Sequence, residues 1–298
     1  MTNHQLGPIL GATLITRDLN RLEQAYCQQL GFTVQQRMQV SPELAALWQT
    51  PDYTGCPLLI LAAANGQAWL RVVEVKDAPA PNPLRRQGWM ALEVNVASVD
   101  AVRQQLSGTD FTIIGEPAFL QVSDAIKAMQ VIGPAGEVLY LTEVQRPVPP
   151  FELPQTSAFT AGLFIPVLAV PDRQQAVTFY QELNQAAPAL QFNTKITVLN
   201  NAWGLPLEQQ YPVATLQLDG QALFEIDELP VAAKLDSAPG QLPSGIALIS
   251  CFCQDLQAVA RKTGVPVQKV VDAYYPAATG VILLKGAAGE VIELVQQP

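Results

Sequence analysis

Two glutamates lie within apolar, strand-like segments: Glu225 in ALFEID and Glu293 in VIELVQ. Apolar surroundings and a neighbouring like charge both raise the pKa of a carboxyl group. A glutamate whose pKa approaches neutrality can remove a proton next to a carbonyl, and a second carboxyl can return it. If the two segments meet across one cleft, Glu225 and Glu293 are therefore the candidate catalytic residues. The alternative is that both are solvated glutamates without a catalytic role.

A second group of side chains is suited to holding a planar organic ligand. Arg71, in AWLRVV, would bind a carboxylate or an enolate through two hydrogen bonds, or stack on an aromatic ring. Trp89 and Tyr140 would form an aromatic wall, with the phenol donating a hydrogen bond. Glu93 follows Trp89 by four residues, so alternation places both on one face of a strand. We predict that these four residues bind the ligand; the alternatives are a solvent-facing or ion-paired arginine and aromatic rings buried in a core.

The composition excludes several kinds of partner and metal centre. The 298 residues contain one histidine, His4, and carry a net charge of −9. One histidine excludes metal sites that this chain alone would build from two or more imidazoles. An acidic chain is repelled by phosphate backbones, so we expect no nucleic-acid partner. The longest apolar run, Leu58 to Ala64, is too short to cross a bilayer, and the first nine residues lack the pattern of a signal peptide. We therefore expect a cytoplasmic protein with no membrane partner.

The sequence contains an internal repeat. Asp18 and Tyr26 recur as Asp172 and Tyr180, in segments that both follow the pattern of a strand, a helix-capping Asp and an amphipathic helix. The turn GPAGE before VLYLTEV likewise recurs as GAAGE before VIELVQQ. The proline-rich stretch RPVPPFELP separates the two copies. We therefore divide the chain into two domains, residues 1–146 and 155–298, joined by a linker over residues 147–154.

Each half divides again into two modules, in which one strand, one helix and three further strands follow in order. For the first module the pattern predicts a strand at 9–16, a helix at 19–30, and strands near 32–38, 58–62 and 69–75. For the second it predicts a strand at 90–96, a helix at 99–106, and strands near 111–114, 126–132 and 138–144. The second half repeats this order. The predicted fold class is α+β, with four βαβββ modules.

Four βαβββ modules with these motifs resemble the vicinal oxygen chelate superfamily, which includes glyoxalase I, extradiol dioxygenases, and fosfomycin- and bleomycin-resistance proteins. The resemblance rests on DLNRLEQAYCQQLGF in the first half and on the glycine turns before the closing strands, and it covers about residues 8–146 and 162–296. It implies modules paired into two glyoxalase-like domains, with curved mixed β-sheets that form clefts. Members of the superfamily differ in chemistry, so the fold does not specify a reaction.

The resemblance also locates the positions at which this superfamily binds its metal ion. In the first half these positions hold Gly11, Arg71, Trp89 and Tyr140. In the second half they hold Ile165, Glu225, Ile246 and Glu293. Only the two glutamates are ordinary ligands of a divalent ion. We therefore expect no cofactor and no catalytic metal, with a weakly bound divalent ion at Glu225 and Glu293 as the alternative.

The sequence leaves open how the modules pair. They can pair within each half, or module one can pair with module four and module two with module three. In the crossed arrangement Arg71 and Glu293 would form an ion pair where the metal ion would otherwise lie. Crossed pairing between two chains would produce a homodimer, so a monomer and a homodimer both remain open.

The expected function is to bind a small, partly apolar organic molecule in a cleft, as the bleomycin-resistance branch of the resemblance implies. The alternative is a lyase, isomerase or dioxygenase-type enzyme that uses Glu225, Glu293 or Arg71, or a residual divalent metal site in the second half. A third reading is a protein whose clefts are filled by its own side chains.

Overall fold

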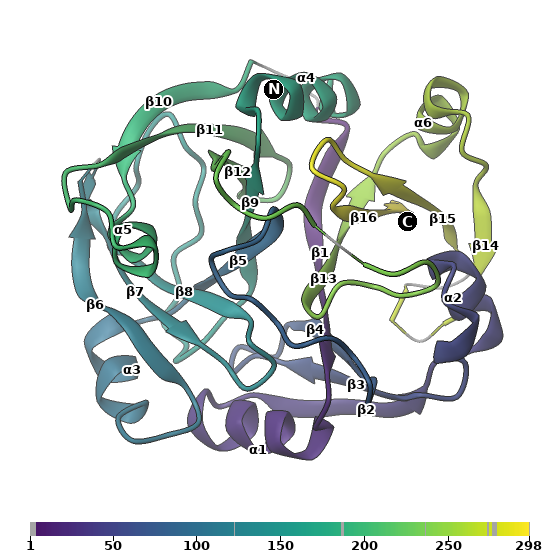
Figure 1. The fold of residues 1–298 in the computed structure, drawn as a ribbon, viewed down its shortest axis with the longest axis horizontal. Helices are drawn as coiled ribbons and strands as arrows, with labels where there is room; N and C mark the ends of the chain where they lie inside the picture. The colour runs from purple at the N-terminus through teal and green to yellow at the C-terminus, as the bar shows by residue number, and fades with distance from the viewer. Residues whose placement is uncertain are drawn as a thin grey trace.

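The computed structural model describes residues 4–121, 123–185, 188–235, 237–272, 274–275 and 279–297, in which the four modules follow one another as predicted (Figure 1). Module one consists of β1 (Leu6–Thr16), α1 (Leu19–Gln29), β2 (Thr33–Gln39), α2 (Pro42–Trp48), the short 3-10 helix η1 (Pro51–Tyr53), β3 (Pro57–Ala62) and β4 (Ala68–Glu74). Module two consists of β5 (Gly88–Asn95), α3 (Val99–Gln105), β6 (Thr112–Leu120), β7 (Ser123–Ile132) and β8 (Val138–Val144). Module three consists of β9 (Leu163–Val170), α4 (Arg173–Asn184), β10 (Leu190–Lys195), α5 (Thr197–Trp203), β11 (Gln210–Leu218) and β12 (Ala222–Glu228). Module four consists of β13 (Gly245–Cys253), α6 (Leu256–Thr263), β14 (Gln268–Val270), β15 (Thr279–Lys285) and β16 (Val291–Gln296).

Each of the two sheets combines modules from opposite halves of the chain (Figure 1). The outer-module sheet joins modules one and four in the strand order β14-β15-β16-β13-β1-β4-β3-β2. The inner-module sheet joins modules two and three in the order β10-β11-β12-β9-β5-β8-β7-β6. Both sheets are mixed: β1 pairs antiparallel with β13 but parallel with β4, and β9 pairs antiparallel with β5 but parallel with β12. The α+β fold of four modules is confirmed, and the crossed pairing is the one adopted. Residues 1–146 and 155–298 are thus repeats along the chain, each of which contributes one module to each sheet.

The motifs that revealed the repeat also form its local structure. Asp18 accepts a hydrogen bond from the backbone N–H of Arg21 at 2.9 Å and so caps α1. Asp172 caps α4 in the same way, through the backbone N–H of Gln175 at 3.0 Å. Each cap satisfies a backbone donor that has no partner within its helix. The first turn of each helix is therefore fixed by a residue that the repeat preserves.

The repeated tyrosines connect the two sheets. Tyr26, in module one, donates a hydrogen bond to the Glu137 carboxylate of module two at 2.7 Å. Tyr180, in module three, donates to Glu290 of module four, also at 2.7 Å. In both pairs the tyrosine and the glutamate belong to modules of different sheets. Burial raises the pKa of Glu137 to about 7, although the hydrogen bond from Tyr26 opposes this effect. The repeat thus places two equivalent polar links in the contact between the sheets.

The two sheets share one large core, and each also covers a smaller core of its own. The shared core lies against α1, α3, α4 and α6 and contains side chains of both sheets. The other face of the outer-module sheet contacts α2, with Leu44, Leu47 and Trp48 in its smaller core. The corresponding face of the inner-module sheet contacts α5 through Val198 and Leu199. These two smaller cores surround the candidate sites. None of the helices in the described part of the chain combines the length and the apolar character needed to cross a membrane.

Candidate functional site

Four equivalent strand positions face α2 in one sheet and α5 in the other. In each sheet the strand register pairs the first position with the second and the third with the fourth. The outer-module sheet has these residues there: Thr13, Arg71, Ser250 and Glu293. The inner-module sheet has these: Val167, Glu225, Glu93 and Tyr140. The two sets occupy corresponding places in the repeat, so they are two versions of one site with different side chains.

The site of the outer-module sheet, here called the closed site, is occupied by a buried ion pair. The Arg71 Nη2 atom lies 2.8 Å from Glu293 Oε2, and both side chains are 0% exposed. Arg71 also donates to the Thr13 hydroxyl at 2.8 Å and to the Tyr275 hydroxyl at 3.2 Å. Burial lowers the pKa of Arg71, but the Glu293 charge, together with Tyr275 and Tyr274, raises it by more, so the pKa is raised overall. The ion pair expected for crossed module pairing is therefore confirmed.

Aromatic side chains complete the closed site. Trp48, the last residue of α2, donates from its indole N–H to Glu293 Oε1 at 2.5 Å. The Arg71 guanidinium lies 4.7 Å from the Trp48 ring centroid and 4.1 Å from that of Tyr274. A Cβ atom added at Gly11 would collide with the Trp69 carbonyl oxygen and approach the Tyr274 hydroxyl to 2.5 Å. Of the sequence-based alternatives, the cleft filled by side chains describes this site, and the prediction that Arg71 binds a ligand from an open cleft was wrong.

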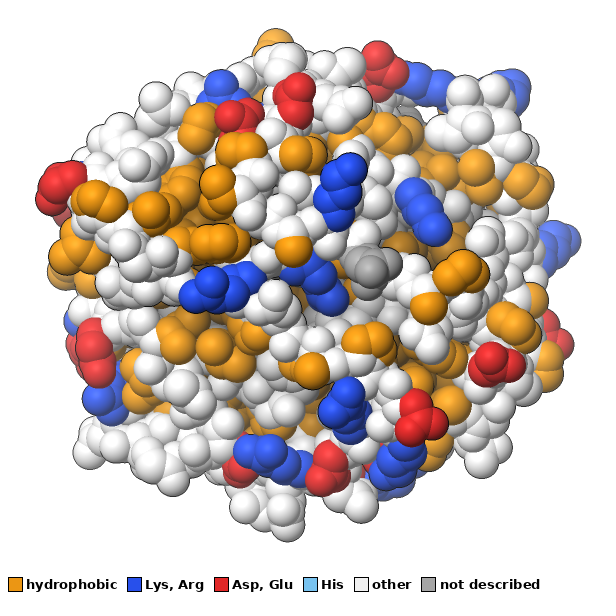
Figure 2. Space-filling view, viewed as in Figure 1, with side chains coloured by type: hydrophobic (Ala, Val, Ile, Leu, Met, Phe, Trp, Pro, Cys, Tyr) orange, Lys and Arg blue, Asp and Glu red, His pale blue; other side chains and the backbone are white. Residues whose placement is uncertain are grey.

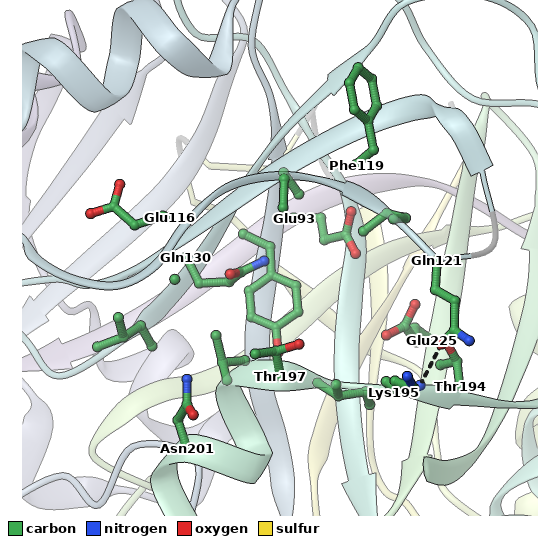
Figure 3. Close-up of a pocket in the computed structure, with 18 of the residues that line it drawn as sticks. Glu93, Glu116, Phe119, Gln121, Gln130, Thr194, Lys195, Thr197, Asn201 and Glu225 are labelled. Carbon is green, nitrogen blue, oxygen red and sulfur yellow. Dashed lines mark hydrogen bonds between the residues drawn. The ribbon is translucent and has the colours of Figure 1, made fainter. Parts of the chain in front are cut away.

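The inner-module sheet keeps an open cavity of about 630 Å³ at the equivalent place (Figure 3). Glu93, Tyr140 and Glu225 line it from the central strands, and Figure 3 shows Gln130 pointing into the same space. Its apolar wall includes Ile113, Ile114, Phe192, Val198 and Val213. Figure 2 shows hydrophobic side chains gathered on the surface between β11 and α5. A largely apolar cavity of this size with a few convergent polar groups is typical of small-molecule sites.

The tryptophan that ends the covering helix differs between the two sites. Trp48 ends α2 and turns into the closed site, where it binds Glu293. Trp203 ends α5 at the equivalent position, but its indole N–H donates to the Leu84 carbonyl at 3.0 Å. The Trp203 ring therefore does not fill the space above Glu225.

At the cavity mouth the backbone N–H of Lys195 donates to Gln121 at 3.3 Å (Figure 3). This hydrogen bond joins β10 to the turn after β6.

The floor of the cavity is acidic and poorly paired. Burial raises the pKa of Glu93, and the nearby Glu225 charge adds to the effect, although a 3.1 Å hydrogen bond from Thr142 opposes it. Burial also raises the pKa of Glu225 and of Asp227. The buried Tyr140 hydroxyl and both Asp227 carboxylate oxygens have no hydrogen-bond partner in the protein. Such groups are costly unless a ligand or water satisfies them.

The expected aromatic wall of Trp89 and Tyr140 is not formed. In the pairing of β5 with β9, Trp89 lies opposite Leu168 and Ala91 opposite Val167, so Met90 is an extra residue in a bulge. The bulge reverses the alternation of side chains at this point. The Trp89 indole therefore enters the shared core, where it donates to the Val291 carbonyl at 2.7 Å. Glu93, predicted from its parity with Trp89, lies on the opposite face and does line the cavity.

Glu225 and Glu293 do not share a cleft, because crossed pairing puts them in different sheets. The acid–base pair expected from the sequence is therefore not formed, and these two carboxylates are not placed to hold one divalent ion between them. Glu293 is the buried counter-ion of Arg71. Glu225 is accessible from the cavity, and a carboxylate with a raised pKa beside the Tyr140 hydroxyl can accept a proton from a bound molecule.

Two residues of the cavity region were missed in the sequence. Asp227 follows Glu225 by two residues on β12, so period-two alternation alone places it on the same face. Gln130 lies opposite Tyr140 in the pairing of β7 with β8. The signal for Asp227 was present in the sequence. Gln130 could be found only once the register between two strands was known.

The donor set of neither site fits a divalent metal ion. In the closed site the Arg71 guanidinium lies against the one carboxylate. In the open cavity the two glutamates are accompanied by Tyr140 and Val167 at the other two positions. Across the described residues, no group of three or more His, Cys, Asp or Glu side chains is placed to hold a metal ion. Two carboxylates without further strong ligands bind a divalent ion weakly.

No family model matches the sequence, and no curated protein matches it at a significant level. Solved structures do share its architecture. Glyoxalase I from Zea mays is 14% identical with a TM-score of 0.62, over 97% of this chain and 92% of that one. A provisionally named dioxygenase from Bacillus subtilis is 11% identical with a TM-score of 0.63, over 99% of this chain and 86% of that one. The cppA protein from Streptococcus pneumoniae is 11% identical with a TM-score of 0.53, over 100% of both chains.

These similarities establish the fold. The chain has the fold of glyoxalase I from Zea mays, so the fold that the resemblance in the sequence motifs implied is confirmed. At such low identity the relatives do not specify what this protein binds or does.

Proposed function

We propose that this protein binds a small, partly apolar organic molecule in the open cavity of the inner-module sheet, without a catalytic metal ion. The difference between the two equivalent sites carries the proposal. The closed site is filled by the protein's own side chains, with the Arg71 and Glu293 charges paired to each other. The equivalent place in the other sheet keeps about 630 Å³ and a tyrosine hydroxyl without a partner.

The energetics favour an occupant in the cavity. A buried hydroxyl without a hydrogen-bond partner costs about 1–3 kcal/mol, which a ligand group bonded to Tyr140 would offset. The apolar wall of Phe192, Val198 and Val213 would gain about 25 cal/mol for each Å² of apolar surface that a ligand removes from water. Together these groups match a molecule with one polar end and an apolar body.

Two substitutions at equivalent helix positions test the location of binding. Asn201 is the fifth residue of α5, is exposed and lines the cavity, whereas Ala46 is the fifth residue of α2 and is exposed beside the closed site. A library of small amines, carboxylates and neutral aromatic compounds is screened by thermal shift. We expect some compounds to raise the melting temperature of the wild-type protein and of Ala46→Trp, but not that of Asn201→Trp. A library without any stabilising compound, or one whose compounds act equally on both variants, would refute the proposal.

The absence of a catalytic metal is tested separately. Because neither site offers more than two carboxylates and neither includes an imidazole, we expect Mn²⁺, Ni²⁺ or Zn²⁺ at low micromolar concentration to leave the melting temperature unchanged. Metal analysis of protein purified without a histidine tag, before and after dialysis against chelator, measures retained ions. One tightly held ion per chain that Glu225→Gln removes would contradict the metal-free assignment.

A further inference from the structure

We propose that the open cavity takes an organic cation, with an ammonium or guanidinium group bound between Glu93, Glu225 and the Tyr140 hydroxyl. This inference rests on the proposed function and adds the chemical class of the ligand. Its starting point is the closed site, in which one of the four equivalent strand positions supplies a cation, the Arg71 guanidinium, which Thr13 and Glu293 of the same set bind. The closed site thus shows what these positions hold once they are filled.

The contacts of Arg71 define that precedent. Its guanidinium contacts a carboxylate, Glu293, at 2.8 Å and the hydroxyls of Thr13 and Tyr275 at 2.8 and 3.2 Å. The ring of Tyr274 lies 4.1 Å away, within range of a cation–π interaction. Carboxylate, hydroxyl and aromatic face are the partners that stabilise a buried organic cation.

The open cavity has the same kinds of partner but no cation among them. Glu225 occupies the position of Arg71, Glu93 that of Ser250 and Tyr140 that of Glu293. The floor therefore carries two carboxyl groups and a hydroxyl. Among the described lining residues the one basic side chain is Lys195, which forms an ion pair with Glu208 at the rim. The positive charge that Arg71 supplies in the closed site must here come from a ligand.

Unpartnered polar atoms point to the same missing group. The Tyr140 side chain is 6% exposed, lines the cavity and has no hydrogen-bond partner for its hydroxyl. Behind it, Asp227 is 0% exposed and neither of its carboxylate oxygens is bonded. A cation at the floor would interact favourably with both Glu93 and Glu225 and would reduce the repulsion between them and Asp227. An anionic ligand would meet Glu93 and Glu225 at the floor, and no unpaired base among the described lining residues.

The apolar wall of the cavity indicates the chemical nature of the rest of the ligand. Ile113, Ile114 and Val198 stand around the space above the floor, and Phe192 contributes an aromatic face. The best match is an amine or guanidine attached to an aromatic or branched aliphatic body. The volume of about 630 Å³ admits such a molecule whole.

Calorimetric titration with four probes of one shape tests this inference: phenethylamine, benzylguanidine, phenethyl alcohol and hydrocinnamate. We expect the two cations to bind the wild-type protein about tenfold or more tightly than the alcohol, and the carboxylate to bind more weakly still, since charge-assisted hydrogen bonds are about twice as strong as neutral ones. Glu93→Gln and Glu225→Gln should each lower the affinity for the cations about tenfold and change the affinity for the alcohol by less than about twofold. Glu116→Gln is the matched control, because Glu116 lies at the rim and is already paired with Arg103.

The outcomes distinguish this inference from the proposed function on which it rests. If the alcohol or the carboxylate binds as tightly as the cations, and Asn201→Trp still abolishes binding, the cavity is a ligand site but the cation assignment is wrong. If no probe and no library compound binds, both proposals are wrong. The comparison of probes in the wild-type protein needs no substitution, so it remains decisive if a glutamine variant folds poorly.

Discussion

Arg71→Met is expected to lower the free energy of unfolding by about 3–5 kcal/mol, because removal of one partner leaves the other charge buried without compensation. The carboxylate left behind is that of Glu293, which is 0% exposed. Its remaining hydrogen bonds, from Trp48 and Ser250 at 2.5 Å and from Tyr275 at 2.9 Å, do not neutralise its charge. Urea denaturation followed by tryptophan fluorescence and by circular dichroism measures the loss.

A second substitution identifies the cause of this loss. Glu293→Gln removes the charge and keeps an oxygen that can accept the Trp48 indole N–H, so the double variant Arg71→Met/Glu293→Gln should recover a large part of the stability. Arg37→Met is the matched control, because the Arg37 side chain is 60% exposed where it pairs with Glu23. An exposed pair contributes about 0–1 kcal/mol. If Arg71→Met costs no more than this control, the ion pair does not stabilise the outer-module sheet.

The protein is expected to lose stability as the pH rises from about 4.5 to 7, and Glu225→Gln is expected to reduce that loss. Burial raises the pKa of Glu225 from 4.5 to about 7, and that of Glu93 is also raised by burial and by the Glu225 charge. A carboxyl group with a higher pKa in the folded state binds more protons when folded, so its contribution is complete below the unfolded pKa and is lost as the pH passes through the folded pKa. For Glu225 the free energy involved is on the order of 3 kcal/mol.

The pH experiment needs an internal reference, because other buried carboxyls titrate in the same direction. Burial raises the pKa of Glu137 and Glu290 as well, and both remain in every variant. Urea denaturation at intervals between pH 4.5 and 8 gives the free energy of unfolding of the wild-type protein and of Glu225→Gln. The difference between the slopes of the two curves against pH is the contribution of Glu225. Glu116→Gln, at an exposed and paired rim position, should follow the wild-type curve. Parallel curves for the wild-type protein and Glu225→Gln would show that Glu225 does not titrate in this range.

The positions of individual side chains show where prediction from sequence reached its limit. Arg71 and Glu293 were located correctly on their strands, and their ion pair followed as soon as the modules were paired crosswise. Trp89 was assigned to the wrong face because the bulge at Met90 interrupts the alternation. Period-two reasoning is reliable along an uninterrupted strand, and the sequence has no signal that marks a bulge of this kind.

The repeat in the sequence by itself determined the four modules, their element order and the equivalence of positions such as Arg71 and Glu225. These features depend on local capping, periodicity and turn residues, which recur wherever the motif recurs. Only the tertiary structure decided that β1 pairs with β13 and β5 with β9, because such contacts join strands far apart in the chain and either module pairing satisfies the local pattern. That choice placed Arg71 against Glu293 under Trp48 and left Glu93, Tyr140 and Glu225 around an open cavity. Whether a cleft is filled or open depends on which side chains meet across the sheet and which rotamers they adopt, and Trp48 and Trp203 show two such arrangements at equivalent helix positions.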